Sequence, residues 1–263
     1  MNRKAVIFGI RGYRLLQSEK SLFKRTRPWG FILFSRNIKN LTQLKNLINE
    51  IKKTVSDKKC PILIDMEGGK VSRLNKIMDF SNFSQYYFGQ LYNKNKKNFN
   101  NYYKIYVSTV SSILRKVGIN INTVPVLDIR RKKSHNIIGS RSFSENPLNV
   151  SKLGNICIKL FNENKIATVI KHIPGHGLSK CDSHKKTPMI KVKKRKLIKN
   201  DFIPFKSCKS IFAMTAHAVY SAYDPNNTAT HSKIIISKII RNHMNFGGIL
   251  ISDDISMKAL KQR

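Results

Sequence analysis

The chain has 263 residues, 41% of them hydrophobic, which is enough for one large core or two small ones. It carries 50 Lys and Arg against 14 Asp and Glu, and the formal charge of +36 favours anionic ligands. The four cysteines lie far apart without a C-x-x-C pair, which excludes a disulfide framework and a cysteine-rich zinc site and indicates a reducing compartment (Cys60, Cys157, Cys181 and Cys208).

The positive charge does not by itself identify a nucleic-acid-binding protein. Basic residues are spread along the whole chain, often beside Asn and Ile, as in 93–98, and no zinc-finger, helix-turn-helix, KH or RNP pattern accompanies them. We therefore favour a compositional drift toward Lys, Asn and Ile over nucleic acid as a partner. The apolar run 5–10 is too short for a secretory signal, and no run reaches membrane-spanning length. We expect a cytoplasmic protein that does not contact the membrane.

Short apolar runs alternate with helical patterns in the first half of the chain. Apolar spacing predicts strands at 5–9, 31–34, 61–64 and 121–127 and helices at 15–23, 41–51 and 102–117. The stretch 92–101 is rich in Asn and Lys, so we expect a surface loop or a frayed helix end there.

The second half continues the same alternation. Strands are predicted at 167–170, 211–215 and 249–252, and helices at 148–164 and 234–244. The lysine-rich stretch 192–199 is expected to be a solvated helix or turn.

The pattern predicts an α/β fold. None of the strands shows the polar and apolar alternation of an exposed antiparallel sheet, so a parallel sheet covered by helices is expected. Seven β/α repeats without a G-x-G-x-x-G motif favour a TIM-type (β/α) barrel over a Rossmann sheet. We expect one domain over 1–263, with no linker. The sequence ends ten residues after Asp253, so the last β/α unit of an eightfold barrel is expected to be missing.

The most informative stretch is 171–184, which follows the predicted strand 167–170. It contains Lys171, His172, His176, Asp182 and His184, and its proline and glycines favour a shaped loop. Residues that follow parallel strands collect at one mouth of a barrel, and the other polar residues in such positions are Asp65, Glu67, His217, Asp253 and Asp254, with Arg73 and Arg141 on adjoining loops. No Cys-rich or H-E-x-x-H pattern is present, so neither a metal nor another cofactor is expected.

Three motifs carry a family resemblance: the segment 65–73 (DMEGGKVSR), the stretch 171–184, and the segment 252–257 (SDDISM). Supporting pieces lie at 30–37, 125–129, 139–143 and 214–217, and together they cover nearly the whole chain in the expected order. The set resembles bacterial β-N-acetylglucosaminidases (β-hexosaminidases) of glycoside hydrolase family 3, in particular the cytoplasmic type of peptidoglycan recycling. Met66 and Lys70 depart from this pattern, where Gln and Arg are usual.

The resemblance implies a retaining enzyme that removes terminal N-acetylglucosamine from muropeptides. It implies Asp253 as the nucleophile and an acid/base pair of His184 and Asp182, whose side chains would share one side of an extended segment. A histidine with an ordinary pKa of about 6.5 can transfer protons at neutral pH. The implied sugar-binding residues are Asp65, Arg73, Arg141, Lys171 and His172.

Several alternatives stay open at this point. Asp254 could replace Asp253, and His217 could contact the sugar or be a satisfied core histidine. We expect His176 and Glu67 to shape their loops and Asp128 to be a structural carboxylate. Arg36 and Asn37 are expected to bond across strand ends. The competing functions are a family 3 enzyme for another β-glycoside, and a non-catalytic remnant or basic binding protein. The oligomeric state is left open.

Overall fold

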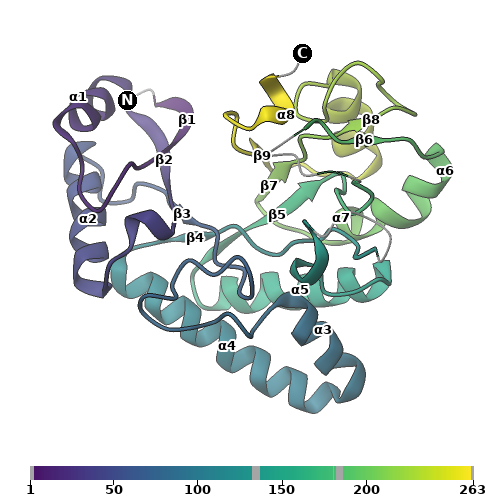
Figure 1. Ribbon diagram of the computed structural model, residues 1–263, viewed down its shortest axis with the longest axis horizontal. Helices are drawn as coiled ribbons and strands as arrows, with labels where there is room; N and C mark the ends of the chain where they lie inside the picture. Colours follow the sequence, from purple (N-terminus) through teal and green to yellow (C-terminus); the bar gives the residue numbers. More distant parts are fainter. Residues whose placement is uncertain (1–2, 132–136, 180, 182–185, 262–263) are drawn as a thin grey trace.

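A parallel sheet of seven strands organises the molecule, which is described here from a computed structural model covering residues 3–131, 137–179, 181 and 186–261 (Figure 1). The sheet order follows the chain: β1 (Lys4–Gly9), β2 (Pro28–Leu33), β3 (Ile62–Ile64), β4 (Ile121–Asn122), β5 (Ala167–Ile173), β7 (Phe212–Thr215) and β9 (Ile249–Ser252). Among the described strands, β1 and β9 are the two edges. The predicted β/α barrel with an incomplete wall is therefore confirmed.

Helices cover one face of the sheet. The larger ones are α1 (Gln17–Thr26), α2 (Leu41–Thr54), α3 (Gln85–Lys94), α4 (Lys96–Val117) and α5 (Pro147–Glu163). Neighbouring helices α1 and α2, α2 and α4, and α4 and α5 pack together, and α3 packs on α4 (Figure 1). In the part of the chain that is described, no helix is both long and apolar enough to cross a bilayer.

Shorter elements complete the chain. They are η1 (Ser35–Asn37), η2 (Gly139–Arg141), α6 (Lys194–Lys196), η3 (Leu197–Asp201), α7 (Ile203–Ser207), η4 (Ile235–His243), α8 (Lys258–Lys261), and a separate parallel pair, β6 (Met189–Ile190) and β8 (Val219–Tyr220). The helix expected at 234–244 is present as a π-helical segment, and 192–199 contains the expected short helical turns. Arg36 and Asn37 bond across strand ends as predicted, since both side chains donate to the Ile10 carbonyl.

Strand alternation divides the apolar residues between two cores. Ile62 and Ile64 of β3 join the large core under the helices, while Leu63 between them faces the other side of the sheet. That side forms a smaller cluster, in which the Trp29 and Phe212 rings meet edge to face at 5.6 Å. The central strands β3, β4, β5 and β7 are thus buried on both faces, as their continuous apolar runs predict, whereas the edge strands β1 and β9 are partly exposed.

The expectation of a surface loop or a frayed helix end at 92–101 is wrong, because α3 and α4 occupy this stretch. Asn95 alone interrupts two helices, α3 and α4, and its side-chain oxygen caps α4 by accepting from the Asn98 amide at 3.0 Å. Tyr92 and Phe99 anchor the two helix ends in the core, with ring centroids 5.3 Å apart. These two buried aromatic side chains hold the stretch in helices, although most of its other residues are Asn and Lys.

Strand ends also differ from expectation around β4 and β5. Regular pairing in β4 stops at Asn122 rather than residue 127, and the Asn122 side chain bonds both the amide and the carbonyl of Met66 on the β3 side. The chain nevertheless stays beside β5, where the Leu127 amide donates to the Lys171 carbonyl at 2.7 Å. Strand β5 runs on to Ile173, past the expected end at 170, so Lys171 and His172 belong to the strand itself.

Candidate active site

The carboxyl ends of the parallel strands bring together polar side chains from distant parts of the chain. Asp65 and Glu67 follow β3, and Asp128 lies on the loop after β4. Lys171 and His172 end β5, His217 follows β7, and Asp253 follows β9. Parallel β/α barrels carry their active sites at this end, because successive strand ends and loops converge there.

Lys171 is the centre of a buried charge cluster. Its side chain is 2% exposed, and its ammonium lies 2.9 Å from Asp65 Oδ1, 2.7 Å from Glu67 Oε1 and 2.9 Å from Thr123 Oγ1. An ammonium has three N–H donors, so these three oxygens satisfy it completely. Burial lowers the pKa of Lys171, but the Asp65 and Glu67 charges outweigh this effect and raise it. Lys171 is therefore a fixed cation that holds two carboxylates in place.

Asp65 links this cluster to a more exposed cation. Its carboxylate accepts from the Thr123 hydroxyl, and its Oδ2 lies 3.7 Å from Arg73 Nη2. Burial would raise the pKa of Asp65, but the Lys171 charge, the Thr123 hydrogen bond and Arg73 hold it far below its usual range. The Arg73 and Asp65 side chains are 28% and 16% exposed, so both reach the surface of the site.

Glu67 bridges Lys171 and Arg141, and its contact with Arg141 is bidentate. Arg141 Nε and Nη2 donate to the two Glu67 oxygens, each at 2.8 Å, in the fork geometry that favours arginine. Burial would raise the pKa of Glu67, but the Arg141 and Lys171 charges lower it to about 2. Glu67 is thus more than a loop-shaping residue, since it positions two of the predicted sugar ligands.

Asp128 fixes the orientation of His172. His172 Nδ1 lies 2.6 Å from Asp128 Oδ2, and a carboxylate can only accept, so Nδ1 carries the proton. His172 Nε2 lies 3.4 Å from Arg141 Nη2, a donor, so this nitrogen presents its lone pair. Burial opposes ionisation of Asp128, but the partnership with His172 lowers its pKa overall. Asp128 is therefore an orienting residue within the site.

His176 belongs to the loop that follows β5. Its backbone amide donates to Asp128 Oδ1 at 2.5 Å, and its ring meets the His172 ring edge to face at 5.7 Å. Burial and the neighbouring His172 lower the pKa of His176 to about 4, so the ring is neutral at pH 7. The loop also needs glycine at 177, where a Cβ would lie 2.2 Å from the Ile129 carbonyl oxygen. These contacts agree with a loop-shaping role for His176.

Asp253 reaches the site through the pairing of the last two strands. Thr215 of β7 is in register with Ser252 of β9, which sets Asp253 beside the residues that follow β7. Its carboxylate accepts from the Asp254 amide at 2.8 Å, and its charge acts on both His176 and His217. Asp254 is exposed, and its carboxylate accepts from the Ser256 amide at 2.8 Å, closing the next turn. This arrangement favours Asp253 over Asp254 as the reactive carboxylate.

Comparison with known proteins identifies the family. Residues 8–263 match the description "Glycosyl hydrolase family 3 N terminal domain". The chain is 31% identical over 260 residues to a β-hexosaminidase of Actinobacillus pleuropneumoniae serotype 3, covering 96% of this chain and 73% of that protein. The chain belongs to glycosyl hydrolase family 3.

Two further family 3 relatives are much longer than this chain. The chain is 30% identical over 262 residues to β-hexosaminidase A of Pseudoalteromonas piscicida, covering 91% of this chain and 43% of that protein. The structure of a glycoside hydrolase family 3 β-N-acetylglucosaminidase from Paenibacillus sp. superposes with a TM-score of 0.87 at 27% identity, covering 97% of this chain and 49% of that one. The chain thus spans less than half of the length of these two relatives.

Most of the predicted site residues of this family 3 chain lie together. Asp65, Arg73, Arg141, Lys171 and His172 form one connected network, described above, and Asp253 lies at the same end of the sheet. The predicted acid/base pair, Asp182 and His184, lies outside the described residues. Sequence reasoning underrated Glu67 and Asp128, although their positions immediately after predicted strands were a usable signal.

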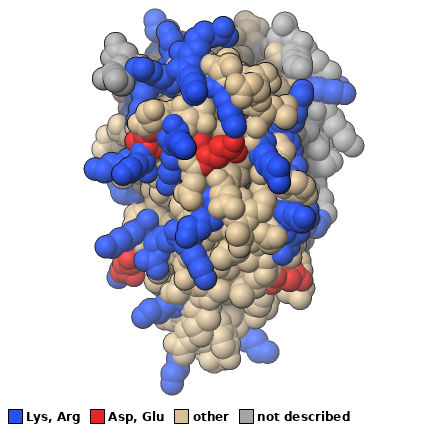
Figure 2. Space-filling model, turned by 90° about the vertical axis from the view of Figure 1, so that its left-hand side faces the viewer, with Lys and Arg blue, Asp and Glu red and all other residues tan. Residues whose placement is uncertain are grey.

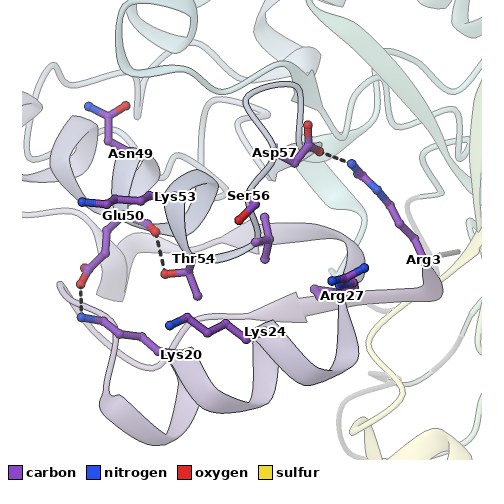
Figure 3. A pocket seen from close by; sticks show the side chains of 12 residues that line it. Arg3, Lys20, Lys24, Arg27, Asn49, Glu50, Lys53, Thr54, Ser56 and Asp57 are labelled. Atoms are coloured by element: carbon purple, nitrogen blue, oxygen red, sulfur yellow. Dashed lines mark hydrogen bonds and ion pairs between the residues drawn. The ribbon is translucent and has the colours of Figure 1, made fainter. Parts of the chain in front are cut away.

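A hollow outside this network lies between α1 and α2 (Figure 3). It has a volume of about 950 Å³, and its two carboxylates are already paired, Asp57 with Arg3 and Glu50 with Lys20 at 2.6 Å. Figure 2 shows basic side chains spread over this side of the molecule rather than gathered in one patch. With both carboxylates engaged in ion pairs, this hollow lacks the free acid and base that hydrolysis requires.

Within the described ranges, no three His, Cys, Asp or Glu side chains are grouped so that they could hold a metal ion. The carboxylates of the site face Lys171, Arg141 and Arg73 instead. The described part of the site is therefore built for hydrogen bonding to a polar ligand.

Proposed function

We propose that this chain is a retaining β-N-acetylglucosaminidase. It releases terminal non-reducing N-acetylglucosamine from muropeptides during peptidoglycan recycling. Asp253 is the nucleophile, and His184 with Asp182 is the acid/base pair. The observation that carries the proposal is the network of Asp65, Lys171, Glu67, Arg141 and His172 at the same sheet end as Asp253.

The network suits a polyhydroxyl ring. Asp65 provides carboxylate oxygens that accept from sugar hydroxyls, and Arg73 and Arg141 provide directional N–H donors. Each of these side chains is partly exposed, at 16%, 28% and 16%. Lys171 and Glu67 lie beneath them and hold the exposed groups in one geometry before the ligand arrives. Such preorganisation lowers the cost of binding and of reaching the transition state.

The proposed reaction follows the double-displacement course of retaining glycosidases. The Asp253 carboxylate attacks the anomeric carbon while the His184 imidazolium donates a proton to the leaving oxygen. A covalent glycosyl-Asp253 ester forms, and the shortened muropeptide leaves. Neutral His184 then takes a proton from water, whose oxygen attacks the anomeric carbon and releases the sugar with its β configuration. Asp182 stabilises the imidazolium in both steps.

Two properties of the chain support the substrate and the compartment. The charge of +36 attracts muropeptides, which carry free carboxylates, toward the protein. All four cysteines are free, and Cys60, Cys157 and Cys208 are buried where they pack as small apolar groups. Free thiols fit the reducing cytoplasm, which is the location we propose.

A chromogenic N-acetylglucosaminide assay tests the proposal. Wild type should hydrolyse the N-acetylglucosaminide, and NMR should detect the β-anomer as the first product. Asp253→Asn should lower kcat by at least about 10³-fold, as removal of a catalytic nucleophile does. Asp254→Asn is the matched control and should keep most of the activity, because that carboxylate faces the following turn.

The competing functions predict different outcomes in this assay, in assays with other β-glycosides and in nucleic-acid binding. Faster turnover of a glucoside or another β-glycoside would assign a different substrate. Folded wild type without any turnover would contradict the enzyme. In that case, binding to nucleic acid that weakens steeply with salt would favour the basic binding protein.

A further inference from the structure

His217 makes a direct side-chain contact with the segment that carries the proposed nucleophile. It follows β7, and its side chain is buried, with 1% of the residue exposed. His217 Nε2 lies 3.1 Å from the carbonyl oxygen of Asp254, the residue after Asp253. Because β9 is the edge strand among those described, β7 and the residues that follow it are the structural support on its paired side.

The hydrogen-bond partners fix the tautomer of this histidine. A backbone carbonyl can only accept, so His217 Nε2 carries the proton and donates to Asp254. Nδ1 lies 2.8 Å from Thr230 Oγ1, closer than the Ala216 carbonyl, which lies 3.3 Å from the same hydroxyl, so Nδ1 is the nearer acceptor for its proton. Thr230 Oγ1 also lies 2.9 Å from Thr215 Oγ1 at the end of β7, so the ring is tied back to the strand it follows.

We propose that His217 is a positioning residue for the nucleophile Asp253, which it holds at the attacking distance through the Asp254 carbonyl. This inference rests on the glycosidase function proposed above. The Asp254 carbonyl also accepts from the Met257 amide at 3.1 Å, so one oxygen joins His217 to the turn after the nucleophile. A reacting carboxylate must be held within a fraction of an ångström of its productive position.

A neutral imidazole is well suited to this task. Burial lowers the pKa of His217, although the nearby Asp253 charge opposes the effect. A neutral N–H donor fixes the backbone without forming an ion pair with the Asp253 carboxylate.

The test compares His217→Ala with His217→Gln, whose amide can still donate to the Asp254 carbonyl. We expect His217→Ala to lower kcat by about 100-fold, the effect of a misplacement near 1 Å, with KM changed less than about threefold. His217→Gln should recover kcat to within about tenfold of wild type. His231→Ala, an exposed histidine outside the site, is the matched control and should leave both constants unchanged.

Hydrogen exchange supplies a readout that does not depend on activity. The amides of residues 254–257 should exchange at least about tenfold faster in His217→Ala than in wild type, and His217→Gln should restore protection. Equal kcat losses in the Ala and Gln variants, or unchanged exchange in the Ala variant, would overturn the positioning role. If wild type has no glycosidase activity, the function fails, and the exchange result alone then decides whether His217 holds the segment.

Discussion

Glu67→Gln provides the sharpest test of the buried charge network. The substitution keeps the shape of the side chain but removes the charge that faces both Arg141 and Lys171. One carboxylate oxygen becomes an NH₂ group, which cannot accept from either cation. Arg141 would lose the carboxylate that it bonds, and Lys171 would keep that of Asp65.

The expected loss of stability follows from the pKa of Glu67. Burial opposes the charged form, but Arg141 and Lys171 lower the pKa from an ordinary value of 4.5 to about 2. At ~1.4 kcal/mol per pKa unit, this depression corresponds to about 3 kcal/mol. Breaking a buried ion pair by removing one partner costs a similar amount, about 3–5 kcal/mol. We therefore expect Glu67→Gln to lower the free energy of unfolding at pH 7 by about 3 kcal/mol.

The pH dependence has a definite sign. The pKa of Glu67 is lower in the folded than in the unfolded state, so its contribution is complete well above pH 4.5 and is lost as the pH falls toward 2. The difference between wild type and Glu67→Gln should shrink to about half at pH 3. Urea unfolding at pH 7, 5, 4 and 3, followed by circular dichroism, measures this difference.

Glu163 on α5 offers a matched control. Its side chain is 54% exposed and lies 3.8 Å from Lys159 one helical turn away. Exposed pairs of this kind contribute less than about 0.5 kcal/mol, so Glu163→Gln should be nearly neutral at every pH. Equal losses for the two variants at pH 7, or a Glu67→Gln difference that does not change with pH, would refute the reasoning.

Two further predictions concern the site and the fold. Asp128→Asn should let the His172 ring adopt the other tautomer and lower kcat/KM by roughly 10-fold or more, as loss of an orienting partner does; unchanged kcat/KM would contradict the orienting role. Asn95→Ala should destabilise the protein by about 1 kcal/mol in urea unfolding, because the N-cap of α4 is lost. Asn95→Asp should preserve the cap and the stability, and equal stability of the Ala and Asp variants would contradict the capping role.

Much of the fold was predictable because the central strands are buried on both faces. A run such as 62–64 has no polar residue to confuse with a loop, and each run lies close to a strand of the structure. The errors fall where side chains override local composition. Asn95 caps a helix inside a polar stretch, and the Asn122 side chain bonds Met66 where regular pairing in β4 stops.

The residues of the site could be predicted from the sequence, but the hydrogen bonds and ion pairs among them could be predicted only in part. Strand ends and family motifs together indicated Asp65, Arg141 and Lys171, because residue type and position along the chain are visible in the sequence. The links among them depend on which atoms meet between residues that lie 44 to 106 positions apart in the sequence. Glu67 and Asp128 make those links. The sequence does not distinguish a carboxylate that binds a ligand from one that binds a neighbouring side chain.

The sugar-binding residues and the Asp253 segment are held in place by different interactions. The sugar-binding half is a closed network in which the Lys171 ammonium has all three donors engaged and Glu67 bonds two cations. Buried, fully paired networks of this kind rigidify a site. The Asp253 segment instead lies on the edge strand among those described, and the His217 hydrogen bond to the Asp254 carbonyl ties it to the residues that follow β7. Binding and attack should therefore respond separately to mutation: changes at Glu67 should affect KM and stability, whereas changes at His217 should affect kcat.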